Sequence, residues 1–300
     1  MSAAPLRVSL VGLGHMGIPI GERLLDAGLP LTVSNRTSAK ALPLVERGAE
    51  QAPSAAGLLA ETDVCITMLA DDAALDAVTG GGGVLEGARP DTVLVDMSTV
   101  SVAASARAAA AAERAGVHFL RATVSGNPVV VRAGNLTIIV SGPRDAYERV
   151  EDVIRAVGPN VYWVGGADEA RVVKLALQVM IAGTAQLMSE ALALGEAGGV
   201  SREVLLEVMG NSAAGSPFVK YKTEPLLRDD YAATFTTSMM LKDTELVREQ
   251  AAASGLSLPL VDLVDDLLRR ATADGYGELD FMALYLALRG VPPESVGSAA

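Results

Sequence analysis

A glycine-rich turn near the N-terminus constrains the fold of this chain more than any other feature. The apolar run Val8–Val11 leads directly into Gly12-Leu13-Gly14-His15-Met16-Gly17, after which apolar residues recur at helical spacing. A strand, a Gly-x-Gly-x-x-Gly turn and a helix in this order predict the first βαβ unit of a doubly wound α/β sheet. Gly12 permits the tight turn, Gly14 lets backbone N–H groups approach a pyrophosphate, and Gly17 lets the helix pack closely on the strand. The motif therefore predicts a dinucleotide site.

The turn after the second predicted strand indicates which dinucleotide binds. A chain that binds NAD commonly has Asp or Glu here, which accepts hydrogen bonds from the ribose 2′-hydroxyl. In this chain, residues 31–34 are followed by Asn35-Arg36-Thr37. Arg36 can form charge-assisted bonds to a 2′-phosphate, which a carboxylate would repel. We therefore expect NADP(H) to be preferred over NAD(H), the alternative being an ordinary turn with an exposed arginine.

The pattern of strands and helices divides the chain into two predicted domains. The expected strands alternate with helical segments and cover residues 7–11, 31–34, 64–68, 93–96, 118–122, 137–141 and 161–164. This alternation predicts an α/β fold whose N-terminal part is a Rossmann-type doubly wound, mostly parallel sheet. A long helix over about 168–197 is followed only by helices, expected at 201–209, 217–227, 238–253, 260–273 and 280–288. We predict a dinucleotide-binding domain over 1–164 and an all-helical domain over 165–300, joined by the long helix and separated by a cleft.

The composition excludes several classes of function. The formal net charge of −12 argues against nucleic acid and anionic membranes as partners, since both require a basic face. Cys65 is the single cysteine and lies in an apolar run, so we expect a core residue and no disulfide. His15 and His118 are the only histidines, which excludes a multi-histidine metal site. We expect no metal, no signal peptide and a cytoplasmic location.

Three segments carry residues suited to chemistry. Asp96-Met97-Ser98-Thr99 and Thr123-Val124-Ser125-Gly126-Asn127 each follow or end a predicted strand, where open α/β sheets bind their ligands. The second segment offers a hydroxyl and backbone N–H groups suited to a carboxylate. Lys174 and Gln178 lie four residues apart on the predicted long helix and therefore share one face. A helical lysine is usually a solvated charge, but the apolar neighbours of Lys174 favour a catalytic role.

Taken together, these motifs resemble the β-hydroxyacid dehydrogenase family, which includes 3-hydroxyisobutyrate dehydrogenase, tartronate semialdehyde reductase and the glyoxylate/succinic semialdehyde reductases. The resemblance covers nearly the whole chain, through Gly12 to Gly17, Asn35-Arg36-Thr37, Asp96 to Thr99, Val124-Ser125-Gly126, Lys174 with Gln178, Phe235, Lys242-Asp243 and Leu279-Asp280-Phe281. The Asn-Arg-Thr turn and the C-terminal motifs are most similar to the glyoxylate/succinic semialdehyde reductases. Residues 178–200 are instead similar to tartronate semialdehyde reductase.

The resemblance implies hydride transfer between the nicotinamide and the carbonyl carbon of a small aldehyde acid. Lys174 would act as general acid or base, and Gln178 would hold the substrate or orient the lysine. The expected substrate contacts are Thr99, Ser125, Gly126, Asn127, Phe235 and Asp243. The expected cofactor contacts are Gly12, Leu13, Gly14, His15, Met16, Gly17, Asn35, Arg36, Thr37, Met68, Leu69, Thr99 and Lys242. The family resemblance also implies a homodimer or homotetramer.

The chain departs from the family at two places. The family commonly reads Asp-Ala-Pro-Val-Ser-Gly-Gly where this chain has Arg121 to Asn127, with Thr123 in place of proline. Asn is common three and four residues after the lysine, where this chain has Leu177 and Gln178. Because of these departures, the sequence does not identify the substrate. Two alternative functions remain: an imine reductase, and a non-catalytic NADPH-binding sensor or scaffold. Imine reductases resemble the dinucleotide half but generally lack the lysine and the Ser-Gly loop.

Overall fold

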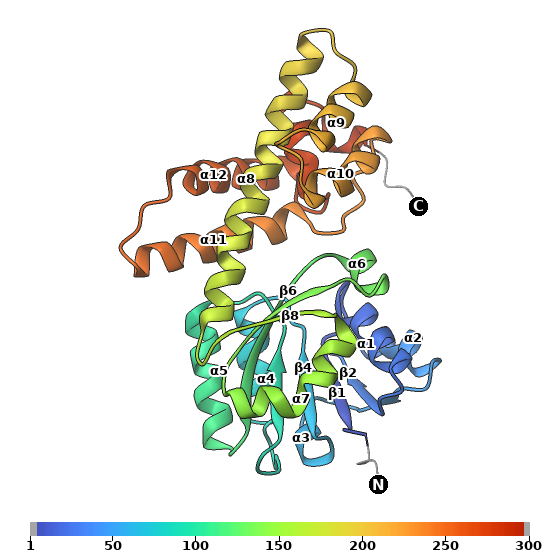
Figure 1. Ribbon diagram of the computed structural model, residues 1–300, viewed down its shortest axis with the longest axis vertical. Coiled ribbons are helices and arrows are strands. Elements are labelled where there is room, and N and C mark those ends of the chain that lie inside the picture. The colour runs from blue at the N-terminus through green and yellow to red at the C-terminus, as the bar shows by residue number, and fades with distance from the viewer. Residues whose placement is uncertain (1–4, 297–300) are drawn as a thin grey trace. The chain divides into compact units, whose positions relative to one another are not determined.

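A computed structural model describes residues 5–296 of the chain (Figure 1). Residues 1–4 and 297–300, at the outer ends of the two predicted domains, lie outside the described residues. The chain divides into two compact units, Met1–Lys174 and Leu175–Ala300. Each unit has its own apolar core.

The N-terminal unit is built on an eight-stranded sheet with the order β3-β2-β1-β4-β5-β6-β7-β8. The strands are β1 (Val8–Val11), β2 (Leu31–Ser34), β3 (Glu50–Gln51), β4 (Val64–Thr67), β5 (Val93–Asp96), β6 (His118–Ser125), β7 (Thr137–Ser141) and β8 (Asn160–Gly165). Neighbouring strands pair in parallel except β6 with β7. The strand order reverses between β1 and β4, which is the switch point where doubly wound sheets bind ligands. The predicted α/β class is confirmed.

Alternating strand residues enter two cores, one on each face of this sheet. Val8 and Leu10 pack into one core, whereas Val11 and Leu94 pack into the other. Figure 1 shows helices covering the sheet: α1 (Gly17–Asp26), α2 (Leu42–Val45), α3 (Leu58–Glu61), α4 (Asp72–Thr79), α5 (Val102–Arg114), α6 (Pro128–Arg132) and α7 (Arg144–Val157). Cys65 is completely buried in the second core, as predicted, and desolvation raises the pKa of its thiol to about 12.

The C-terminal unit is helical. Its helices are α8 (Glu169–Ala197), which begins in the first unit, α9 (Arg202–Asn211), α10 (Pro217–Leu227), α11 (Thr237–Ala253), α12 (Pro259–Ala271) and α13 (Leu284–Arg289). Ser201, Ser216 and Thr236 each accept a hydrogen bond from a backbone N–H of the following helix, which begins α9, α10 and α11. Between residues 175 and 296 the structure has no strand, as the sequence predicts.

The segment containing the predicted substrate loop differs from its prediction. The strand expected at 118–122 continues to Ser125, because β6 pairs with antiparallel β7 as far as Ser125 opposite Thr137. Thr123 is therefore a buried strand residue, not a loop residue. The short strand β3 was not predicted.

The C-terminal helices also differ in detail. The helix expected at 280–288 is divided, because the Asp280 side chain accepts a hydrogen bond from Met282 N and caps a separate 3₁₀ turn over Phe281–Ala283. The helix expected at 260–273 ends at Ala271 and continues as a π-helical turn over Thr272–Tyr276.

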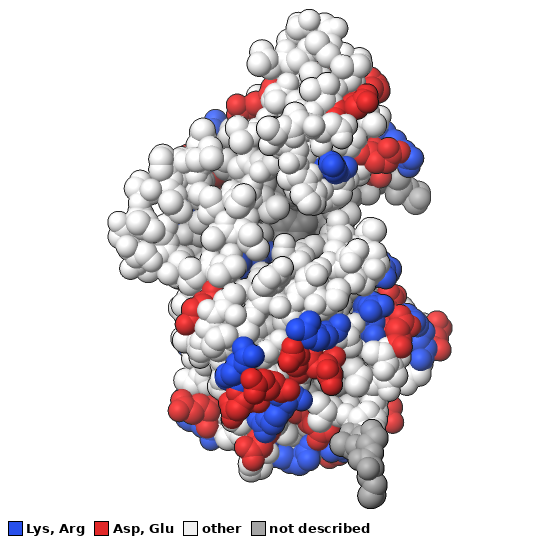
Figure 2. Space-filling view, viewed as in Figure 1, with Lys and Arg blue, Asp and Glu red and all other residues white. Residues whose placement is uncertain are grey.

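The surface carries mixed charge over one helix, and another helix is long and apolar. Figure 2 shows acidic and basic groups interspersed over α7, where Arg144 pairs with Glu148 and Arg155 with Glu151. Such mixed charge forms no continuous basic face in this view. α8 is long and apolar enough to cross a membrane by length and composition, as core helices of soluble proteins also are.

Candidate active site

The glycines of the first loop differ in what surrounds them. Gly12 has φ +97°, and a Cβ built there would stand 2.2 Å from the carbonyl oxygen of Met68. A Cβ on Gly17 would stand 1.9 Å from the carbonyl oxygen of Gly12. A Cβ on Gly14 would meet no protein atom within 4 Å. Gly12 and Gly17 are therefore required by the packing of the loop, whereas Gly14 leaves open space beside the backbone, which fits the approach of a pyrophosphate.

The turn after β2 is tied to this loop by one side chain. Asn35 Oδ1 accepts a hydrogen bond from Leu13 N at 2.9 Å, and Asn35 Nδ2 donates to the carbonyl of Thr37 at 2.9 Å. Asn35 thus fixes the loop and the turn relative to each other, a role that the sequence did not reveal. Arg36 and Thr37 are exposed beside it. The guanidinium is accessible to an anion next to the dinucleotide loop.

Other predicted cofactor contacts lie along the same carboxyl edge of the sheet. The register places Val11, Thr67 and Asp96 side by side at the ends of β1, β4 and β5. The residues that follow these strands are therefore neighbours, among them the half-buried Met68, Leu69 and Thr99. Within the loop, His15 is exposed, Met16 is half-buried and Leu13 is buried.

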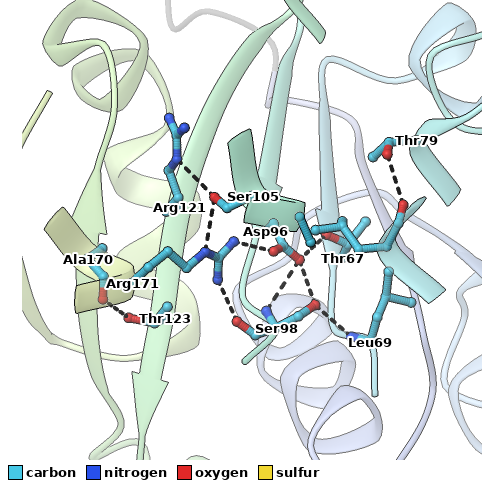
Figure 3. A network of polar contacts seen from close by, with 12 residues as sticks. Thr67, Leu69, Thr79, Asp96, Ser98, Ser105, Arg121, Thr123, Ala170 and Arg171 are labelled. Atoms are coloured by element: carbon cyan, nitrogen blue, oxygen red, sulfur yellow. Dashed lines mark hydrogen bonds and ion pairs between the residues drawn. The ribbon is translucent and has the colours of Figure 1, made fainter. Parts of the chain in front are cut away.

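Arg171 holds the start of α8 at this edge (Figure 3). Its side chain is 1% exposed and forms an ion pair with Asp96, whose side chain is completely buried. Its Nη1 donates to the carbonyl oxygen of Ser98 at 2.5 Å, and its Nε donates to Ser105 Oγ at 3.3 Å. Asp96 Oδ1 accepts from Thr67 Oγ1 at 2.6 Å, so both carboxylate oxygens have partners. Lys174 follows Arg171 by three residues on the same helix.

Sequence reasoning missed Arg171. The signal that could have found it is a lone arginine three residues before Lys174, combined with an aspartate at the end of an otherwise apolar strand. A buried charge needs a partner of opposite sign, and Asp96 was the acidic residue at the end of the neighbouring strand.

Two departures from the family, at Arg121 and Thr123, lie on β6 and bond to residues at the start of α8. Arg121 Nε donates to Asp168 Oδ1 at 2.8 Å, and Thr123 Oγ1 donates to the carbonyl oxygen of Ala170 at 3.1 Å. Both side chains are buried. Burial lowers the pKa of Arg121, an effect that the carboxylate of Asp168 opposes.

The segment from Ser125 to Asn127 is more accessible. Ser125 ends β6 and is half-buried, and Gly126 is exposed with φ +145°. Asn127 Oδ1 accepts from Val130 N at 3.0 Å, so this side chain begins α6. The positive φ favours glycine here, and a Cβ would also stand 2.9 Å from Leu136 Cδ1, at the end of a flexible side chain.

In the C-terminal unit, the structure brings three of the predicted residues together. Gln178 Nε2 donates to Asp243 Oδ2, and Lys242 Nζ lies 2.9 Å from Asp243 Oδ1. Asp243 is completely buried, so its carboxylate is held between an amide and an ammonium group. The Phe235 ring packs edge-to-face on Phe281, at 6.1 Å between centroids.

Two protein-family models match this chain over most of its length. Residues 7–165 match the NAD-binding domain of 6-phosphogluconate dehydrogenase, and residues 169–288 match the NAD-binding domain of NADP-dependent 3-hydroxyisobutyrate dehydrogenase. The chain belongs to the β-hydroxyacid dehydrogenase family. The family resemblance seen in the sequence is thereby confirmed. This β-hydroxyacid dehydrogenase binds a nicotinamide dinucleotide and is an oxidoreductase of the hydroxyacid or semialdehyde type.

Two named relatives match this chain over most of their own length. The NAD-dependent L-serine dehydrogenase of Pseudomonas aeruginosa is 33% identical, over 92% of this chain and 95% of that protein. Glyoxylate/succinic semialdehyde reductase 2 of Arabidopsis thaliana is 29% identical, over 94% of this chain and 79% of that protein.

Two solved structures of named enzymes have folds similar to that of this chain. The 3-hydroxyisobutyrate dehydrogenase of Mycobacterium tuberculosis, solved with L-serine, has a TM-score of 0.86 and 28% identity over 95% of this chain and all of that one. An imine reductase from Pseudomonas sp. has a TM-score of 0.66 and 25% identity over 95% of this chain and all of that one.

Proposed function

We propose that this β-hydroxyacid dehydrogenase is an NADPH-dependent enzyme that interconverts a small semialdehyde and the corresponding hydroxy acid. In this proposal residues 1–164 bind the dinucleotide and residues 165–300 complete the substrate side. The preference for NADPH is supported by the exposed Arg36 and by the absence of any acidic residue in the turn 35–40. A 2′-phosphate beside Arg36 would gain charge-assisted hydrogen bonds and meet no repelling carboxylate.

The observation that carries the proposal is the anchoring of α8 by Arg171 at the end of β5. Lys174 lies one helical turn beyond that anchor, about 4.5 Å along the axis. The lysine is therefore carried by a helix that starts at the edge where the dinucleotide loop lies. A bound reduced nicotinamide supplies a hydride to the carbonyl carbon. Lys174 Nζ would donate a proton to the carbonyl oxygen, so that an N–H bond breaks as an O–H bond forms. In the oxidative direction Lys174 would take that proton back.

The remaining predicted residues have proposed roles in holding the substrate. The hydroxyl of Ser125 and the N–H of Gly126 would bind the substrate carboxylate, with Asn127 and Thr99 beside them. Gln178 would present its amide to the substrate or to Lys174, with its orientation fixed by Asp243. Phe235 would supply an apolar wall, and Lys242 would approach the cofactor.

The decisive experiment replaces Lys174 with alanine. We expect kcat to fall by about 10²–10⁴-fold, the usual contribution of a positioned general acid. The Kd for NADPH, measured by fluorescence titration, should change little. Lys220→Ala, which removes an exposed lysine from α10, is the matched control. A turnover near that of the wild type in Lys174→Ala would refute the assignment.

Two alternatives are separated by a substrate panel. The structural similarity to an imine reductase favours testing a cyclic imine beside glyoxylate, succinic semialdehyde, tartronate semialdehyde and L-serine. Reduction of the imine alone would establish the first alternative. Tight NADPH binding without turnover of any compound would establish the second, a non-catalytic sensor or scaffold.

We also propose a homodimer or homotetramer in a reducing, cytoplasmic environment. Met180, Leu187 and Leu194 recur every seven residues on α8 and are 67%, 59% and 78% exposed. Figure 2 shows a largely uncharged surface over α12 as well. Exposed apolar stripes of this kind are typical of subunit interfaces. The buried thiol of Cys65 fits a compartment without disulfide formation. Sedimentation equilibrium measures the subunit number.

A further inference from the structure

We infer that Arg171, together with Arg121, Asp168 and Thr123, positions Lys174 for proton transfer. The inference rests on the catalytic role proposed for Lys174. It concerns residues outside the expected substrate and cofactor contacts, which act through the start of α8.

The Arg171 guanidinium joins three elements at one point. It reaches Asp96 and the carbonyl of Ser98 at the end of β5, and Ser105 on α5. These partners occupy three different nitrogen atoms of one planar fork, so the side chain can adopt only one orientation. Ser98 directly precedes Thr99, which is expected to line the site. One guanidinium therefore sets the distance between the Thr99 segment and the helix that carries Lys174.

A second set of contacts holds the same turn through β6 and α5, and Figure 3 shows those of Arg121 with Ser105 and of Thr123 with Ala170. Ser105 Oγ accepts hydrogen bonds from both Arg121 and Arg171 and donates to Asp168 Oδ1 at 2.9 Å. Arg121 reaches the same carboxylate oxygen, and Thr123 donates to the carbonyl of Ala170. The backbone and side chains of residues 168–171 are thus held by β6 and α5 as well as by β5.

These contacts depend on the residues at which this chain departs from the family. The family commonly has Asp and Pro where this chain has Arg121 and Thr123. An ionised Asp only accepts hydrogen bonds, and the Pro side chain has no polar atom, so neither could donate to Asp168 or to Ala170. The two departures therefore form part of the anchor of α8.

The rate of proton transfer depends on how precisely this anchor places Lys174. Misplacement of a reacting group by about 1 Å can cost about 10²-fold in rate. A lysine in place of Arg171 keeps the buried positive charge beside Asp96 but has one nitrogen instead of a fork. Arg171→Lys should therefore loosen the helix start without leaving the carboxylate unpaired.

The test compares Arg171→Lys, Asp168→Asn and Thr123→Val with Arg144→Lys, an exposed arginine that pairs with Glu148. We expect Arg171→Lys to lower kcat by about 10²-fold, and the other two site variants by about fivefold each. The Kd for NADPH and the KM for the substrate should stay within about twofold in all variants, and Arg144→Lys should match the wild type. If a melting curve shows that Arg171→Lys does not fold, the kcat values of Asp168→Asn and Thr123→Val test the inference. Wild-type kcat in every folded site variant would overturn the inference.

Two further measurements separate positioning from a merely structural role. In a Lys174→Ala background, Arg171→Lys should change the residual turnover by less than about twofold, because its effect acts through the lysine. An undiminished effect in that background would overturn the inference. The second measurement is the rate at which an acylating reagent modifies Lys174, followed by mass spectrometry across pH. Arg171→Lys should alter that rate and Arg144→Lys should not.

The labelling experiment also distinguishes failure of this inference from failure of the proposed function. If Lys174→Ala keeps normal turnover, the catalytic role fails, but the labelling rates still report whether Arg171 controls the position of the lysine. If Lys174→Ala is inactive and the labelling rates do not change, the positioning role alone fails.

Discussion

Replacing Gly14 or Gly17 by alanine should have opposite consequences, because the two glycines serve different partners. A methyl group on Gly17 would stand 1.9 Å from the Gly12 carbonyl oxygen, whereas real Cβ contacts stay beyond 3.0 Å. The loop and the start of α1 must therefore separate by about 1 Å, and overpacking of that kind costs about 1–3 kcal/mol. A methyl group on Gly14 would meet no protein atom within 4 Å and needs no such movement.

Gly14→Ala and Gly17→Ala should differ in their stability and in their affinity for NADPH. Gly17→Ala should lower the free energy of unfolding by about 1–3 kcal/mol in a urea titration without cofactor. Gly14→Ala should unfold at the same urea concentration as the wild type. It should nevertheless raise the Kd for NADPH by about 10²-fold, because the methyl group would occupy the approach to the backbone and break one or two charge-assisted hydrogen bonds. Isothermal titration calorimetry measures this Kd, with Gly81→Ala as a control outside the loop, since a Cβ there would also meet no protein atom within 4 Å.

Two outcomes would refute this reasoning. Wild-type affinity of Gly14→Ala for NADPH would mean that the pyrophosphate does not approach the backbone at Gly14. Unchanged stability of Gly17→Ala would mean that the close contact with Gly12 relaxes without cost.

Two further predictions concern charged groups. Arg36→Asp should reverse the preference between NADPH and NADH, shifting the ratio of their kcat/KM values by about 10²-fold or more, since it replaces charge-assisted bonds with repulsion; an unchanged ratio would contradict the NADP assignment. Lys222→Met should lower the free energy of unfolding by about 3–5 kcal/mol, because it leaves the carboxylate of Asp280 buried without the ammonium that lies 2.6 Å away. Urea titration measures this loss, and the double variant Lys222→Met/Asp280→Leu should recover part of it; a loss below about 1 kcal/mol would indicate that the pair behaves as an exposed one.

The sequence predicted those parts of the fold that depend on local pattern. The helix α10 has the predicted ends, and its start follows from local sequence because Ser216 caps it and Pro217 occupies its first position. The strand β6 was predicted too short, because its last residues depend on pairing with β7 and not on their own apolar pattern.

The side-chain partners at the candidate site could not be predicted in the same way. Arg171 and Asp96 are 75 residues apart in the chain, and Gln178 and Asp243 are 65 apart. Such pairs depend on how whole elements pack, and no periodicity in a single sequence encodes that packing. The sequence identified Gln178 and Asp243 as separate candidates but not as a hydrogen-bonded pair.

The structure changes what the departures from the family imply about the substrate. In the sequence, Arg121 and Thr123 flank the Ser-Gly motif and place the usual substrate in doubt. In the structure, their side chains are buried and bond to residues at the start of α8, so they alter how that helix is held and not the chemistry of the loop surface. Substrate discrimination should therefore be sought at Ser125 and Gly126, which are more accessible, and at Leu177, where a polar side chain common in the family is replaced by an apolar one. At Leu177 the loss of a polar group would weaken discrimination against apolar substituents, because no buried donor is left unpaired when the substrate lacks a matching acceptor.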